Sequence, residues 1–408
     1  MQNVYVWLHK NLFRRGRTKG RWNIPRTHQE AAGLTDRQRE SLSELLSLGY
    51  LSGYEEASDL VNVTVHEPDL TFEGYNLYTS GHAQEAVLMD MEGKVLHKWS
   101  YEFRDAFPEL PDPEGLPNLD YWRRVYLYEN GDILAIYEGF GIIKLDKDSN
   151  LIWANSRRCH HDLFLDENAI IYVLSKEAKI VPRIHEYELI VDDFITIIDP
   201  EGNVVRNVSI LEAFEKSSYA SFLRSGPKYG ELFHTNTIEV FDGSSSHRSP
   251  YFKNGNVLIS ILKTSVIAIL DMEQEKIVWA LAGQWVGQHQ PTLLENGNIL
   301  LLDNYGHRHS MSKVVEINPF TQEIIWAYEG TLENVFSTKT LGSNQRLPNG
   351  NTLITESDSG RAFEVTPDKR IVWEYHNPAR SGANNELVAS LFEVIRLEAE
   401  YPMNWLNR

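Results

Sequence analysis

Histidine or arginine recurs at one fixed distance before asparagine turns in distant parts of the chain. The residue seven positions before the turn is Arg123, His161 or His289, and the turns begin at Asn130, Asn168 and Asn296. An imidazole ring can act as a nucleophile, donate a proton or bind a metal. Its recurrence at one position favours a shared site over separate solvated loop residues.

The segment before each turn is called its lead-in segment. Two further lead-in segments carry other residues. The segment "HTNTIEVF" carries His234 and Asn236, and an insertion separates it from the turn at Asn254. Before the turn at Asn349, the lead-in stretch 342–344 ends in Asn344. The set therefore combines imidazole, guanidinium and amide groups, all of which can donate hydrogen bonds.

Two kinds of site fit this set. Three histidines could hold a zinc ion, although Asp162 is the one evident carboxylate at the same position of the repeat. In an anion site, the donors would grip tetrahedral oxygens while one neutral imidazole attacks sulfur or phosphorus and carries the group covalently. Positive charge nearby would lower the pKa of the attacking imidazole and keep it neutral. The amide of Asn236 beside His234 favours the anion site.

The elements around these residues form a repeat. Each unit has an Asn-Gly turn, two apolar strands, a polar turn and a strand that ends in tryptophan. Clear copies begin at Asn130, Asn254, Asn296 and Asn349 and end at Trp153, Trp279, Trp326 and Trp373. Two degenerate copies contain Trp99 and Val205. Six units of about fifty residues predict an all-β fold, a six-bladed β-propeller, rather than an array of β-sandwiches.

This fold would position the candidate residues. The lead-in segments become the innermost strands of the blades and converge on the central axis, whereas the tryptophans belong to the core between blades. We expect three segments: a basic tail, short helix (35–49) and lead-in over 1–74, the propeller over 75–378, and a segment over 379–408 that packs on or closes it. The stretch 208–225 predicts a second helix.

Charge and cysteine content narrow the classes of partner. The formal net charge of the 408 residues is −18, which excludes nucleic acid as the main partner because phosphate binding needs a basic surface. Cys159 is the single cysteine, so no intramolecular disulfide can form. In the basic tail, apolar residues precede the basic ones, the reverse of a secretory signal. A solvated tail, a membrane-surface segment and a protein-binding segment all remain open.

The motifs resemble those of the bacterial arylsulfotransferases that work without a nucleotide sulfate donor. The stretches that carry the resemblance are "HHD" (160–162), "HTNTI" (234–238), "GQHQPTLLENGNILLLDN" (287–304) and "RLPNGNTLITE" (346–356). They stand in the order seen in that family, and the resemblance covers roughly residues 75–376. It implies a six-bladed propeller that moves a sulfuryl group from an aryl sulfate to a phenol through a sulfohistidine, without a cofactor or metal.

The resemblance also implies roles for individual residues. The nucleophile falls on His289, and the groups that contact the sulfuryl oxygens fall on His161, His234 and Asn236. The family has an arginine in the next strand, where this chain has Leu262 or Lys263. Lys263 could substitute as a point charge, and Arg308, Arg123 and Asn344 are further candidates for substrate binding. Family members are exported, which implies a periplasmic location.

Two other functions remain open. The missing arginine, the basic tail and the helix at 35–49 favour a catalytically inactive propeller that serves as a binding or scaffold subunit of a larger, membrane-associated assembly. The clustered histidines are also compatible with a metalloprotein. A homo-oligomer is compatible with either reading.

Overall fold

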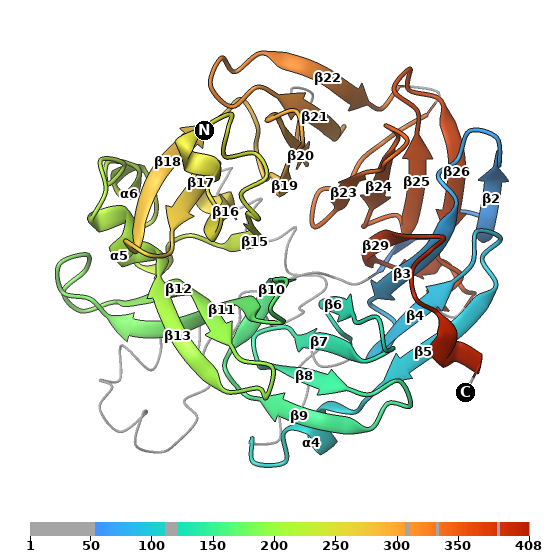
Figure 1. Ribbon diagram of the computed structural model, residues 1–408, viewed down its shortest axis with the longest axis horizontal. Coiled ribbons are helices and arrows are strands. Elements are labelled where there is room, and N and C mark those ends of the chain that lie inside the picture. Colours follow the sequence, from blue (N-terminus) through green and yellow to red (C-terminus); the bar gives the residue numbers. More distant parts are fainter. Residues whose placement is uncertain (1–53, 111–120, 307–310, 332–333, 382–383, 408) are drawn as a thin grey trace.

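The chain folds into a ring of six antiparallel β-sheets around a central axis (Figure 1). The computed structural model describes residues 54–110, 121–306, 311–331, 334–381 and 384–407. Each of these sheets is a blade built on four antiparallel strands, two blades carry a fifth strand, and the predicted six-bladed β-propeller is confirmed. No helix among the described residues is long and apolar enough to cross a membrane.

The first three blades share one strand order, from the axis outward. Blade 1 consists of β29 (Leu391–Glu398), β3 (Gly74–Ser80), β4 (Glu85–Met89) and β5 (Val95–Ser100). Blade 2 consists of β6 (Arg124–Leu127), β7 (Ile133–Tyr137), β8 (Gly141–Leu145) and β9 (Leu151–Asn155). Blade 3 consists of β10 (Cys159–Leu165), β11 (Ile171–Ile180), β12 (Leu189–Ile198) and β13 (Val204–Ser209), with β14 (Gly230–Glu231) parallel to β12.

The other three blades repeat this order. Blade 4 consists of β15 (Thr235–Val240), β16 (Asn256–Ile261), β17 (Val266–Asp271) and β18 (Lys276–Ala282). Blade 5 consists of β19 (His289–Leu293), β20 (Ile299–Asp303), β21 (Lys313–Ile317) and β22 (Ile324–Glu329). Blade 6 consists of β23 (Ser343–Arg346), β24 (Thr352–Glu356), β25 (Arg361–Val365), β26 (Ile371–His376) and the added outer strand β2 (Asn62–His66).

Short elements decorate the ring. A separate sheet contains β1 (Tyr54–Glu56), β27 (Arg380–Ser381) and β28 (Leu387–Ala389). The described helical segments are α4 (Phe103–Ala106), α5 (Ile210–Glu215), α6 (Phe222–Ser225), η2 (Pro250–Phe252), η3 (Leu262–Thr264) and η4 (Asn404–Asn407). The helix predicted at 208–225 is two short helices, α5 and α6, and the Ser217 hydroxyl donates to the Phe214 carbonyl oxygen where α5 ends. The helix predicted at 35–49 and the basic tail lie outside the described residues.

The repeat in the sequence reflects how the blades stack. Every residue of β7, β16 and β20 is buried, because each central strand packs against neighbouring blades on both faces. The closing tryptophans lie on the outer strands, and the indole N–H groups of Trp99, Trp153, Trp326 and Trp373 donate to carbonyl oxygens of neighbouring blades. Trp99 donates to Gly131 O at 2.9 Å and Trp373 donates to Met91 O at 2.9 Å, each in a turn of the next blade. The expectation that these residues form inter-blade core agrees with this placement.

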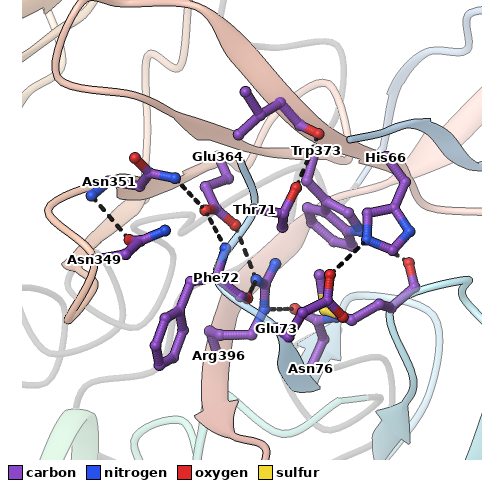
Figure 2. A network of polar contacts seen from close by, with 12 residues as sticks. His66, Thr71, Phe72, Glu73, Asn76, Asn349, Asn351, Glu364, Trp373 and Arg396 are labelled. Atoms are coloured by element: carbon purple, nitrogen blue, oxygen red, sulfur yellow. Dashed lines mark hydrogen bonds and ion pairs between the residues drawn. The ribbon is translucent and has the colours of Figure 1, made fainter. Parts of the chain in front are cut away.

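Both ends of the described chain take part in closing the ring. Two strands outside the predicted range 75–378 pair with blades: β2 joins blade 6, and β29 becomes the innermost strand of blade 1. Figure 2 shows the polar network at this junction. Arg396 on β29 and Glu364 on β25 form a fully buried ion pair at 2.9 Å. The same carboxylate accepts from Phe72 N at 2.8 Å and Asn351 Nδ2 at 2.7 Å, so the network ties blade 6 to blade 1.

Replacing Arg396 with methionine should lower the free energy of unfolding by about 3–5 kcal/mol, because Glu364 would stay buried without its cation. Urea denaturation measures this change. The exposed pair Arg370–Glu67 provides a matched control: Arg370→Met should cost no more than about 1 kcal/mol. A change below that value for Arg396→Met would contradict the role of the buried pair in closure.

Candidate active site

A cavity of about 210 Å³ opens at the axis, where the lead-in segments of four blades meet. Arg123 comes from blade 2, His161 from blade 3, His234 from blade 4 and His289 from blade 5, and all four line this cavity. Their side chains are buried. The structure thus brings together four predicted residues that are as far as 166 positions apart in the sequence (from 123 to 289).

A local irregularity of the inner strands places the three histidines. The register of β10–β11, β15–β16 and β19–β20 shifts at the histidine end of each inner strand. His161 and His234 have φ of 55° and 54°, and Gln290, directly after His289, has φ of 47°. Non-glycine residues rarely adopt such values, and a bulge of this kind re-aims a side chain. Three blades therefore use the same backbone feature to present an imidazole at the axis.

The hydrogen bonds of His289 determine its tautomer. Its Nδ1 lies 2.8 Å from Asn304 Oδ1 and 2.9 Å from the Gly287 carbonyl oxygen. The Asn304 amide cannot be reversed, because its Nδ2 donates to the carbonyl oxygens of Thr338 (2.8 Å) and Leu341 (2.7 Å). Both neighbours of Nδ1 are acceptors, so Nδ1 carries the proton and Nε2 keeps its lone pair.

The charge state of His289 follows from its surroundings. Burial, together with the positive charge of Arg123, lowers the pKa of the His289 imidazole from 6.5 to about 3. His289 is therefore neutral at physiological pH, and Nε2 is available as a nucleophile on the cavity side.

His161 and His234 lie in contact but have different partners. Their ring centroids are 4.8 Å apart. His161 Nδ1 lies 2.9 Å from His160 Nδ1, and burial lowers the pKa of both rings well below the usual value. His234 Nδ1 instead lies 3.0 Å from a carboxylate oxygen of Glu231. The two imidazoles are therefore chemically distinct although they share one wall of the cavity.

Arg123 is the buried guanidinium of the cavity. Its side chain is 4% exposed, and Nε lies 3.9 Å from Glu138 Oε2. Glu138 also accepts from the His161 backbone N–H at 2.9 Å and lies 3.8 Å from Lys176 Nζ. The carboxylate thus sits among cations, which leaves the cavity with net positive character at the end where Arg123 lies.

The remaining predicted residues lie apart from this cavity or outside the described chain. Asn236 is buried and donates to the Gln288 carbonyl at 2.8 Å, so it supports the loop before His289. Asn344 donates to the Gln290 carbonyl at 3.0 Å and lines a second cavity of about 920 Å³, formed by the later residues of the inner strands. Arg308 lies outside the described residues.

Where the resemblance places an arginine, at Leu262 or Lys263, the residue that reaches the cavity is Leu262. Its side chain lines the cavity, because β16 ends at Ile261 and the chain turns into η3. Lys263, 39% exposed, points instead to Glu231, with Nζ 3.6 Å from Oε2. Lys263 therefore contacts a carboxylate behind His234 and is not among the residues that line the cavity.

Sequence reasoning missed three residues that support the histidines. Glu138 follows directly after the buried strand β7, Glu231 lies three positions before His234, and Asn304 follows β20. The available signal for Glu138 and Asn304 was a polar residue directly after the apolar central strand of a blade. The short spacing to His234 was the signal for Glu231.

One group of side chains in the described chain has the composition of a metal site. Ligand atoms of Glu138, His160 and His161 lie within 4.8 Å of one another. Two cations already contact the carboxylate, Lys176 at 3.8 Å and Arg123 at 3.9 Å, and both would repel a divalent ion. The donor set therefore fits an anion-binding site better than a metal site.

Comparison with known proteins identifies the family. The sequence model described as Arylsulfotransferase (ASST) matches residues 123–378, which include all four cavity residues above. The chain belongs to the arylsulfotransferase family. A search of curated proteins found no match.

Solved structures that are similar to this arylsulfotransferase-family chain have low sequence identity to it. A protein of unknown function from Bacteroides caccae is 12% identical, with a TM-score of 0.48, over 79% of this chain and 98% of that one. A streptogramin B lyase structure is 13% identical, with a TM-score of 0.45, over 84% of this chain and 97% of that one.

The tautomer of His289 can be measured directly. In histidine-labelled protein at pH 7, ¹⁵N NMR should show Nδ1 of His289 protonated and Nε2 bare, because both Nδ1 neighbours are acceptors. The signals are assigned by their loss in His289→Ala. Lowering the pH toward 5 should leave them unchanged, since the pKa is about 3. A titration near 6.5, or a protonated Nε2, would contradict this geometry.

Proposed function

We propose that the protein transfers a sulfuryl group from an aryl sulfate to a phenol through a covalent intermediate on His289. The observation that carries the proposal is the neutral imidazole whose Nδ1 is fixed by Asn304 and Gly287 while Nε2 faces a cavity lined by donors. Membership of the arylsulfotransferase family supports the substrate class.

The lining of the cavity suits both parts of an aryl sulfate. Tyr121, Tyr305, Leu262 and Leu341 supply apolar surface for an aromatic ring. Arg123 and the imidazoles of His161 and His234 supply donors for sulfuryl oxygens. Donors fixed before the reaction stabilise charge that develops in the transition state.

In the first half of the reaction, His289 Nε2 attacks sulfur and the bond between sulfur and the aryl oxygen breaks. The electron pair of that bond goes to the phenolate oxygen, which takes a proton from a cavity donor. In the second half, a phenol attacks the sulfuryl group, its proton returns to that donor, and the electron pair of the N–S bond returns to Nε2.

The guanidinium that the family places in the next strand is absent here, and Arg123 takes over its charge in this proposal. Arg123 is buried and lines the cavity, whereas Leu262 fills the family position. Leu262 is also the observation that favours the second candidate function, an inactive propeller that binds a partner. Turnover of an aryl sulfate distinguishes the two functions.

Rapid mixing of the protein with p-nitrophenyl sulfate should release a burst of p-nitrophenol equal to the number of active sites, followed by a slower steady state that a phenol acceptor accelerates. A burst reports a covalent intermediate that forms faster than it is consumed. The variant His289→Ala should lose both phases. Wild-type protein without any turnover would favour the binding function.

Removing the Arg123 guanidinium should weaken binding of the transition state more than binding of the substrate. Arg123→Met should lower kcat by about 10²–10³-fold, which corresponds to the loss of one donor to a developing anion. Arg346→Met serves as the matched control, because Arg346 pairs with Glu316 at 3.0 Å and lines the second cavity. The control should keep kcat close to the wild-type value. Equal losses in the two variants would argue for a general effect of lost charge.

A further inference from the structure

Two imidazoles in the cavity could each protonate the departing phenolate, and the structure separates them by their partners. His161 Nδ1 lies 2.9 Å from another neutral ring, His160, and 3.4 Å from Glu138 Oε1. His234 Nδ1 lies 3.0 Å from Glu231 Oε2, within hydrogen-bond range of a carboxylate. A carboxylate within hydrogen-bond range of Nδ1 stabilises an imidazolium. At His161 a second imidazole is the nearest group to Nδ1, and the Glu138 carboxylate is farther away and is shared with Arg123 and Lys176.

The position of Glu231 is fixed by the fold. Glu231 lies on β14, which pairs in parallel with β12 through Ile190 and Val191. On the other side, the backbone N–H of Thr235, directly after His234, donates to Asp193 Oδ2 at 2.7 Å. The carboxylate and the imidazole are therefore held from both sides before any substrate binds, as a positioned acid requires.

Lys263 lies on the solvent side of Glu231. Its Nζ lies 3.6 Å from the same Glu231 oxygen that contacts His234. Because Lys263 is 39% exposed, solvent screens its charge, and the contact between Glu231 and His234 does not depend on it. Other titratable or charged groups near His234 or in the same cavity include Arg123, Glu138, His160, His161, Lys176, Asp193, His289 and Lys339.

The geometry points to Glu231 as the positioning residue that makes His234, and not His161, the proton donor to the leaving phenolate. The inference rests on the proposed sulfuryl transfer. As the bond between sulfur and the aryl oxygen breaks, that oxygen takes the proton from Nε2 of the His234 imidazolium, while Nδ1–H stays hydrogen-bonded to Glu231. The neutral ring then accepts the proton of the incoming phenol at Nε2.

The requirement for this proton depends on the leaving group, which provides the test. Phenolate is a strong base and needs protonation as it leaves, whereas p-nitrophenolate is a much weaker base and leaves without it. In Glu231→Gln, kcat/KM for phenyl sulfate should fall about 100-fold or more, and kcat/KM for p-nitrophenyl sulfate should fall less than about 5-fold. Glu231→Asp should recover part of the activity on phenyl sulfate.

If Glu231→Gln fails to fold, the variant His234→Gln tests the same inference. His234→Gln keeps a hydrogen-bonding side chain but has no transferable proton, so it should show the same selective loss on phenyl sulfate. Equal losses on the two esters, or no loss on phenyl sulfate, would overturn the inference. Either result leaves the proposed function intact, because that function fails only if wild-type protein turns over neither ester.

Lys263→Met is the matched control for charge. If Lys263 acts only through Glu231, both esters should keep activities near the wild-type values, because the carboxylate remains on His234. A fall of about 10²-fold or more on both esters would instead show that Lys263 itself contacts the sulfuryl group, which contradicts the arrangement described here.

Discussion

Closure of the ring is the constraint on which the site depends. The four cavity residues come from four blades, and only a closed propeller holds their inner strands around one axis. The junction lies where β29 enters blade 1 and β2 covers blade 6, and the buried pair of Arg396 and Glu364 joins these blades. A buried pair of this kind is costly to break, since one partner left alone remains charged in a medium of low polarity. The junction stabilises the site from the far side of the ring.

The imidazoles around the axis have different neighbours, and these neighbours give them different chemical roles. His289 has amide and carbonyl acceptors on Nδ1 and is held neutral by burial and by Arg123. His161 is also kept neutral by burial, whereas His234 contacts a carboxylate. In many active sites, different surroundings make one titratable side chain an acid and a similar side chain a base or nucleophile. The same histidine type thus serves as nucleophile, oxygen-binding group and proton donor in the proposed reaction.

The sequence predicted the fold because the repeat is local: Asn-Gly turns, apolar strands and closing tryptophans recur in each blade and can be counted. It also predicted that Arg123, His161 and His289 meet, since their position relative to the turn is shared, but the predicted residues Asn236, Asn344 and Lys263 do not line their cavity. It could not separate Leu262 from Lys263, because adjacent residues face opposite sides and β16 ends at Ile261, just before both. The sequence offered only weak signals for Asn304 and Glu231, because their importance comes from side-chain contacts that form only after the strands pack.

The proposed reaction depends on a covalent bond between sulfur and His289. Protein mixed with an aryl sulfate in the absence of acceptor, quenched in alkali and digested, should yield a peptide containing His289 that is heavier by one sulfuryl group. Addition of a phenol before quenching should remove this mass. Turnover with no modified peptide, or with the group on a residue other than His289, would contradict the account.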